Sequence, residues 1–301
     1  MCKQRYFDGY LIVDWSASTV ANSGKDSIWW CHMAWDDDTL VMCDVQNPLT
    51  RLDAYQQMFS LLASYVESNK RVLVGFDFAY GYPAGFSQSL LPGKPASWLS
   101  VWEYFEQHIE DDRLNHNNRF EVASRINADI SGDIAPFWGC PAKKQTTTLS
   151  MRKPAGALQG GLPEFRIAER NNATHSVWKL SYPGAVGSQV MMGLPYLYRL
   201  RYHPALVTHS KIWPFETGLQ TLNADQLHDI NIIHAEIYPS LIKVTPKAYE
   251  IKDEVQVKAL AGFFADLDHQ GNLVNLFAGN KRLSAEERVI VESEEGWILG
   301  V

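Results

Sequence analysis

Two aspartates each follow an apolar, strand-like run, and their positions point to a cation site. Asp14 follows Tyr-Leu-Ile-Val at residues 10–13, and Asp77 follows Val-Leu-Val-Gly-Phe at residues 72–76. A carboxylate placed where a buried strand gives way to a loop loses water, so it is usually paired or bound to a metal. Open α/β sheets also build their sites outside the carboxyl ends of their strands. The two aspartates therefore predict one cation-binding cleft, with simple capping of the following turns as the alternative.

Two further acids extend this candidate site. Glu236 ends the apolar run at residues 232–235, and Asp253 opens an amphipathic helix pattern. Four carboxylates of this kind could hold one or two Mg²⁺ or Mn²⁺ ions, because hard cations prefer oxygen ligands. Two such ions, about 3.5–4 Å apart, can activate a water and stabilise a leaving oxygen. The alternatives are that Asp253 only complements its helix dipole and that Glu236 pairs with a buried arginine.

The elements that must position these acids follow from hydrophobic periodicity. The order at the start of the chain is strand, strand, strand, helix, strand. In the helix, apolar residues recur three and four positions apart, and Thr50 can cap its start with Asp53 three residues later. Strands are expected at 9–15, 27–35, 39–45, 71–77, 207–215 and 231–238, and helices at 50–68, 97–109, 184–201 (which Pro195 should kink or end) and 253–268.

Residues 81–183 show weak periodicity and many Gly, Pro, Asn and Ser residues. A stretch of this length without a clear pattern is typical of an insertion or a segment that lines a cleft. No linker or low-complexity segment divides the chain. We therefore expect one α/β domain over residues 1–301, with an insertion at about 84–183.

The bulk composition indicates an ordinary cytoplasmic globular protein. The chain is 46% hydrophobic and 20% charged, and it has no apolar run of about 18 residues, so no membrane span is expected. Its four cysteines show no C-x-x-C spacing and no zinc pattern, which favours free thiols in a reducing cytosol. The N-terminal residues do not resemble a secretory signal. The oligomeric state is left open.

Charge is unevenly distributed along the chain. The net charge is −7, yet residues 113–211 carry thirteen Lys or Arg and only five Asp or Glu. A basic stretch inside an acidic frame is a candidate phosphate-binding surface, and a merely solvated surface is the alternative. Arg166 and Lys143 are the predicted phosphate contacts in this stretch. Trp138 could stack on a base, although a tryptophan is often a core residue.

Four segments resemble the family called domain of unknown function 429, usually described as predicted RNase H-like nucleases. They are Ile-Val-Asp-Trp-Ser-Ala at 12–17, Gly-Phe-Asp-Phe-Ala-Tyr-Gly-Tyr-Pro at 75–83, Ala-Glu-Ile-Tyr-Pro at 235–239 and Lys-Asp at 252–253. The resemblance implies a ribonuclease H-like core, which is a five-stranded mixed sheet with an early antiparallel meander and flanking helices. The element order described above agrees with it independently.

The resemblance also implies roles for individual residues. Asp14 matches the acid of the first strand in such nucleases, Asp77 the acid of the fourth strand, and Asp253 the acid of the last helix. Glu236 has no secure place in that pattern. Related resolvases often carry a second Asp three residues into the last helix, where this chain has Gln256. This departure puts two-metal catalysis in doubt.

The function expected from the sequence is phosphodiester hydrolysis that depends on Mg²⁺ or Mn²⁺, on a nucleic acid or nucleotide. Asp14, Asp77 and Asp253 would be the metal ligands, and Glu236 would assist. One alternative is a nucleotide-dependent phosphotransferase of the acetate and sugar kinase class, which also begins with an Asp and small hydroxyl residues; Ser16 would then bind substrate. The other is a non-catalytic nucleic-acid or nucleotide-binding protein, with a weak link through the family to molybdopterin guanine dinucleotide synthesis.

Overall fold

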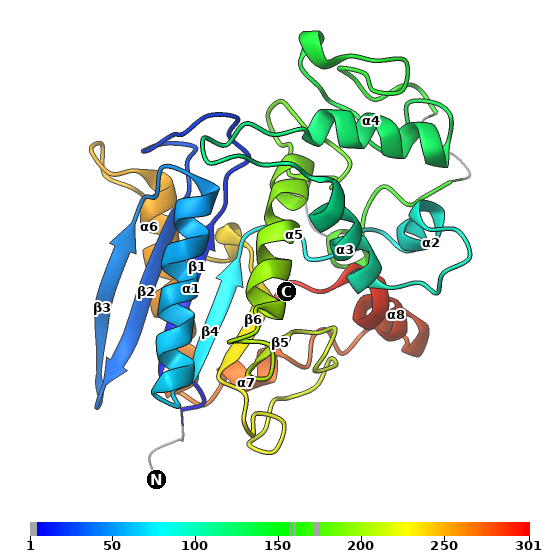
Figure 1. The fold of residues 1–301 in the computed structure, drawn as a ribbon. Coiled ribbons are helices and arrows are strands. Elements are labelled where there is room, and N and C mark those ends of the chain that lie inside the picture. The colour runs from blue at the N-terminus through cyan, green and yellow to red at the C-terminus, as the bar shows by residue number, and fades with distance from the viewer. Residues whose placement is uncertain (1–4, 157, 159–160, 171–174) are drawn as a thin grey trace.

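Six strands form one mixed sheet in the computed structural model, which describes residues 5–156, 158, 161–170 and 175–301. The strand order is β3-β2-β1-β4-β6-β5. β2 runs antiparallel to β1 and β3, whereas β1, β4, β6 and β5 run parallel to one another (Figure 1). The strands are β1 (Gly9–Asp14), β2 (Trp29–Asp36), β3 (Thr39–Gln46), β4 (Val72–Phe76), β5 (Ser210–Ile212) and β6 (Ile232–Glu236).

The α/β class and the order of the first elements are confirmed, and the strand count is corrected. The family resemblance implied five strands, and the sheet has a sixth, β5, at its edge. The apolar run at 207–215 had predicted a strand there, but only three of its residues pair, with β6. The cis Trp213–Pro214 bond lies directly beyond the point where this pairing ends.

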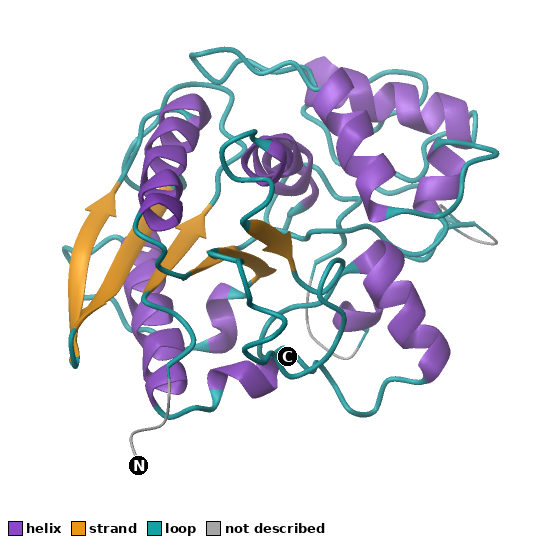
Figure 2. Ribbon diagram, turned by 60° about the horizontal axis from the view of Figure 1, so that its bottom comes forward, coloured by secondary structure: helices purple, strands orange, loops and turns teal. Residues whose placement is uncertain are grey.

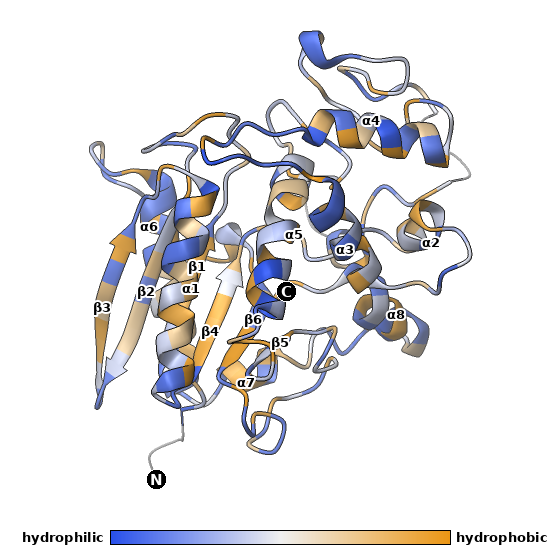
Figure 3. Cartoon of the chain, viewed as in Figure 1, coloured by the Kyte–Doolittle hydropathy of each residue, from blue (hydrophilic) through white to orange (hydrophobic). Residues whose placement is uncertain are grey.

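Helices cover both faces of the sheet (Figures 1 and 2). Alternation along β1 separates the two cores. Leu11 and Val13 pack in the cluster that contains the buried residues of α1 and α5, and Tyr10 and Ile12 pack in the cluster that contains those of α6. In Figure 3, β4 and β6 are coloured hydrophobic along most of their length, as expected for strands buried on both faces. These three helices are α1 (Arg51–Glu67), α5 (Gly187–Tyr202) and α6 (Lys252–His269).

Helix α1 begins as predicted but is rotated about its axis. The Thr50 side chain accepts from the Asp53 amide, which confirms the predicted cap. The expected apolar face was Leu52, Tyr55, Phe59, Leu62 and Val66, yet only Leu62 of these is fully buried. The buried side consists of Arg51, Ala54, Met58, Leu62 and Tyr65. Small Ala54 lies against the core, and the larger aromatic residues lie at its margin.

Pro195 does not end helix α5. The helix runs unbroken from Gly187 to Tyr202 with Pro195 inside it. Most residues of α5 are buried, so packing against the sheet, α1 and α3 stabilises the helix despite the lost backbone hydrogen bond.

The weakly periodic stretch forms a helical lobe beside the sheet, visible on the right of Figure 1. It was predicted to hold one clear helix and holds three. Aromatic residues fill its interior: Tyr82 lies 5.1 Å from Trp178 and 5.6 Å from Phe105 between ring centroids. Its elements are α2 (Phe86–Leu90), α3 (Trp98–His108), α4 (Arg119–Ile130) and the short 3₁₀ turns Ala142–Lys144 and Ile167–Glu169.

The last part of the chain returns to the sheet. After α7 (Leu273–Leu276), α8 (Ala285–Ile290) and a π-helical turn (Val291–Glu295), the chain passes the end of β6. There the Leu299 amide donates to the Glu236 carbonyl at 2.8 Å. None of the described helices is long and apolar enough to cross a bilayer.

Candidate active site

Sheet geometry brings Asp14 and Asp77 together, and we call these two residues the aspartate pair. β1 and β4 are parallel neighbours, with Val13 opposite Phe76, so the residues that follow emerge at the same edge. The Asp77 amide donates to the Val13 carbonyl at 3.2 Å, and the Trp15 amide donates to Asp77 Oδ1 at 2.8 Å. Alternation places both carboxylates on the α6 side of the sheet. The predicted meeting of the two acids is therefore present in the structure.

Both carboxyls of the aspartate pair hold their protons more tightly than an ordinary aspartate does. Burial raises the pKa of Asp14 well above its ordinary range, and repulsion from Asp77 and Asp253 raises it further. Burial also raises the pKa of Asp77, to about 7, against the opposing effect of hydrogen bonds from the Trp15 amide and from Asp14. Two adjacent carboxylates without a compensating cation cannot both ionise cheaply. Within the described residues, no arginine or lysine pairs with either carboxyl.

Asp253 lies near the aspartate pair, but its carboxylate accepts a hydrogen bond from the backbone of another loop. It sits in the first turn of α6, whose first residues lie at the carboxyl end of the parallel strands. Its Oδ2 accepts from the Asp26 amide at 3.0 Å. Its charge still raises the pKa values of both Asp14 and Asp77. Within the described ranges, no three His, Cys, Asp or Glu side chains are gathered tightly enough to enclose a metal ion, so two acids converge and the third stands nearby.

Two cavities meet at Asp14. The larger, about 370 Å³, is lined by Asp77, Glu236, Lys252 and Gln256 among others. The smaller, about 280 Å³, is lined by Asp253 together with Ser16, Asp26 and Ser27. Gln189 of α5 borders both cavities, and its Nε2 donates to the Trp15 carbonyl at 2.5 Å.

Ser16 lies beside the acids as expected, but its hydroxyl binds backbone groups of its own loop. Its hydroxyl donates to the Asp26 carbonyl at 3.1 Å and accepts from the Ser18 amide at 3.2 Å. Through Asp26, Ser16 is linked to the segment that contacts Asp253. The side chain lines the smaller cavity, so it could also contact a ligand there.

Glu236 requires a different interpretation from the one the sequence favoured. Residues 232, 234 and 236 alternate with Ala235 and Ile237, which pack in the α6-side core, so Glu236 points to the opposite face from the aspartate pair. It forms a bidentate ion pair with Arg166, at 2.6 and 2.7 Å, and accepts from the Tyr80 amide at 2.9 Å. Burial raises the pKa of Glu236, and Arg166 opposes that rise. This is the buried arginine partner that the sequence left as the alternative.

Arg166 therefore cannot act as a free phosphate contact. Its side chain is 1% exposed, and it binds Glu169 at 2.9 Å as well as Glu236. Burial alone would lower the pKa of its guanidinium, and the two glutamates raise it instead. We call Arg166, Glu169 and Glu236 the Arg166 cluster. In this cluster one guanidinium pairs with two carboxylates, and the cluster also borders the larger cavity.

Neither of the other predicted substrate contacts lies at the cavities. Trp138 is 5% exposed and packs in the aromatic core of the lobe, so the stacking role is replaced by a core role. Lys143 is exposed on the 3₁₀ turn Ala142–Lys144 and lines neither of the cavities at Asp14.

The basic stretch is partly neutralised by ion pairs. Among the described residues, six of its thirteen cations pair with acids, four of them with acids that lie outside residues 113–211. Long-range pairing therefore accounts for part of the charge asymmetry seen in the sequence. The pairs are Lys144–Glu121, Lys153–Glu164, Arg166–Glu236, Arg170–Glu287, Arg199–Glu106 and Arg201–Glu216.

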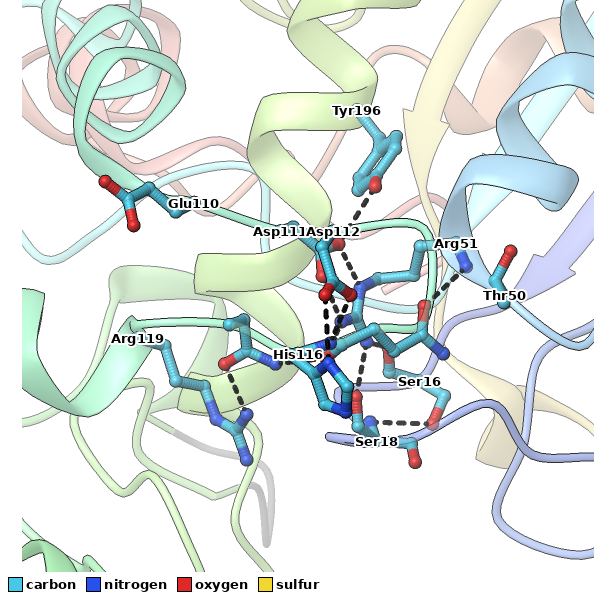
Figure 4. Close-up of polar contacts among 12 residues, drawn as sticks. Ser16, Ser18, Thr50, Arg51, Glu110, Asp111, Asp112, His116, Arg119 and Tyr196 are labelled. Carbon is cyan, nitrogen blue, oxygen red and sulfur yellow. Dashed lines mark hydrogen bonds and ion pairs between the residues drawn. The ribbon is translucent and has the colours of Figure 1, made fainter.

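Sequence reasoning missed Arg51, which holds the loop that follows Asp14 (Figure 4). Its guanidinium is fully buried and uses all five of its N–H donors. Two go to Asp111 at 2.6 Å each, two to the carbonyls of Ser16 and Ser18 at 3.1 and 2.8 Å, and one to the Asn115 carbonyl at 3.0 Å. A cation at the start of an amphipathic helix gave no signal of this role.

Comparison of the chain with protein-family models, with curated proteins and with solved structures found no match. The resemblance to the domain of unknown function 429 family therefore stays a prediction.

Proposed function

We propose that this protein is a divalent-metal-dependent hydrolase of phosphate esters of nucleic acids or nucleotides, built on a ribonuclease H-like core. The observation that carries the proposal is the aspartate pair, two neighbouring carboxyls at the ends of adjacent parallel strands, whose pKa values are raised by burial. The sheet supports it through an antiparallel β1-β2-β3 meander followed by parallel β4 and β6. A fold alone does not establish activity, so the site carries the argument.

The donor set fits a hard cation. Asp14 and Asp77 offer carboxylate oxygens in a half-buried place where their charges repel each other, and a bound Mg²⁺ or Mn²⁺ would relieve that repulsion. Such an ion, when bound, polarises a phosphoryl oxygen and lowers the pKa of a bound water. Asp253 would join through a water or after releasing the Asp26 amide. Gln189 keeps the Trp15 backbone, and with it the strand end, in place.

The sheet and Gln256 bear on the two alternative functions, a phosphotransferase and a non-catalytic binding protein. The phosphotransferase alternative normally needs a second copy of the core, and the described residues form one sheet. The non-catalytic alternative is favoured by Gln256, which is buried and lines the larger cavity where a further acid would serve a second ion. It is treated as an outcome of the test below.

Titration of Mn²⁺ into the protein, followed by assays on nucleotides and oligonucleotides, tests the proposal. We expect one stoichiometric Mn²⁺ site that Asp14→Asn and Asp77→Asn abolish. Asp253→Asn should weaken it less, because Asp253 is not in the pair. Asp266→Asn is the matched control: it is exposed on the same helix, about 20 Å further along its axis. Binding of Mn²⁺ without hydrolysis of any substrate would support the non-catalytic alternative.

A further inference from the structure

The larger cavity has the size of a small-ligand pocket. At about 370 Å³ it lies near the lower end of the roughly 300–1,000 Å³ that such pockets occupy. Its walls come from three parts of the chain. Asp14 and Asp77 belong to the sheet, Arg166, Glu169, His175 and Val186 to the segment that leads into α5, and Lys252 and Gln256 to α6.

Lys252 is an uncompensated cation on this cavity. It is the first residue of α6, it is exposed, and in the described part of the chain it forms no ion pair and no side-chain hydrogen bond. Its helix neighbour Lys258, by contrast, pairs with Glu254. An ammonium that lines the same cavity as the aspartate pair is placed to bind the outer oxygens of a phosphate.

Part of the remaining wall is apolar. Phe78, Ile237, Tyr238 and Pro239 line the cavity beside these charged groups. One cavity therefore offers carboxylates for a cation, a lysine for an anion and an apolar wall for an organic group. This combination is the usual composition of a site that holds a whole small molecule in one orientation.

We propose that the substrate is a small phosphate ester of about mononucleotide size, held within this cavity with its phosphate between the aspartate pair and Lys252. This inference rests on the proposed function and narrows its substrate class. A polymer substrate would need a track of cations along its backbone. Exposed cations of the lobe, such as Lys143 and Arg152, do not line this cavity.

The reaction balances as a hydrolysis. The oxygen of water forms a bond to phosphorus, and the bond from phosphorus to the ester oxygen breaks with its electron pair going to that oxygen. The leaving alcohol takes up one proton, and the attacking water releases one to solvent. No oxidant or further reactant is needed.

The test compares two thymidine substrates on the Mn²⁺-loaded protein: thymidine 5′-(p-nitrophenyl phosphate) and a single-stranded 20-mer of thymidine. We expect kcat/KM to be at least tenfold higher for the small ester. Lys252→Gln should raise its KM about tenfold, with a smaller change in kcat, and Lys252→Arg should restore most of the affinity. Lys258→Gln on the same helix is the matched control and should leave KM unchanged. Mn²⁺ affinity is measured for every variant.

The outcomes separate this inference from the proposed function. Efficient internal cleavage of the 20-mer, or an unchanged KM in Lys252→Gln, would overturn the inference and leave the hydrolase proposal standing. Absence of Mn²⁺ binding in the wild-type protein would refute both. If Mn²⁺ binds and calorimetry then shows no affinity for thymidine 5′-monophosphate, the small-substrate inference is wrong whatever the activity.

Discussion

The aspartate pair and the Arg166 cluster both place acids at the same edge of one sheet. They differ in charge, because the acids of the cluster pair with a cation and the two aspartates do not. Among the described residues, Asp14 and Asp77 pair with no cation, and a backbone amide donates to Asp77, so the repulsion between the two carboxylates is not relieved. Glu236, on the neighbouring strand, has a bidentate arginine and a backbone amide. Position at a strand end therefore does not distinguish a functional acid from a structural one. The presence or absence of a compensating cation does.

The largest expected difference comes from removing the cation of the Arg166 cluster. Arg166→Met should lower the free energy of unfolding by about 3–5 kcal/mol, because Glu236 and Glu169 stay buried after losing the charge of the guanidinium. Urea denaturation measures this, with exposed Arg152→Met as the control, expected to stay within about 0.5 kcal/mol. A loss below about 1 kcal/mol would mean that the cluster is solvated in solution.

The aspartate pair should make the protein less stable as pH rises. The folded-state pKa of Asp77 is about 7, above its ordinary value of 3.8, so between these values the folded state binds more protons than the unfolded state. Its contribution is complete below about pH 4 and is lost as pH rises towards 7, at up to about 1.4 kcal/mol per pH unit. Denaturation of the wild type and of Asp77→Asn from pH 4 to 8 isolates this contribution as the difference between the two curves. Saturating Mn²⁺ should reduce the loss at high pH, and parallel curves would contradict the raised pKa of Asp77.

Asp14→Asn should separate stability from function. At pH 8 without metal we expect the variant to be more stable by about 1–2 kcal/mol, since one of two repelling charges is gone. Mn²⁺ binding should be lost in the same variant. Glu236→Gln is the comparison, and it should destabilise because it weakens an ion pair. If Asp14→Asn is instead destabilised, Asp14 is a structural partner and its proposed role is wrong.

The smallest effect is expected outside both sets. Lys143→Gln removes an exposed cation of the lobe that lines neither cavity at Asp14. Stability should change by less than about 0.5 kcal/mol, and KM for the small ester should stay unchanged. Oligonucleotide binding measured across a salt series should keep its slope, whereas a change of about 0.7 would indicate a phosphate contact at Lys143.

Local patterns in the sequence were enough to locate most of the secondary structure and the aspartate pair. Apolar runs gave the strands, and parallel strand ends gave the meeting of Asp14 with Asp77. Strand alternation along 232–237 indicates that Glu236 and Ala235 face opposite sides, but it does not indicate which side carries the site. Whether Glu236 is a site residue or an ion-pair partner depends on Arg166, which lies 70 residues away in the chain.

Other features depend on contacts that no local pattern records. The rotation of α1 about its axis depends on which of its residues fit against the sheet. Helix α4 lies in the lobe, whose aromatic core brings together residues from positions 82 to 178. Counting charges along the chain overstated the basic surface, because four of its cations pair with acids outside that stretch.

The saturated guanidinium of Arg51 has a consequence for folding. The backbone around Ser16 and Ser18 is tied to residues 33 to 95 positions away in the chain through Arg51 and Asn115. This loop can therefore become ordered only after α1 and residues 111–115 have come together, and each of those closures costs chain entropy first. The Asp14 loop should belong to the most protected cooperative unit in native-state hydrogen exchange, unlike the many active-site loops that open locally.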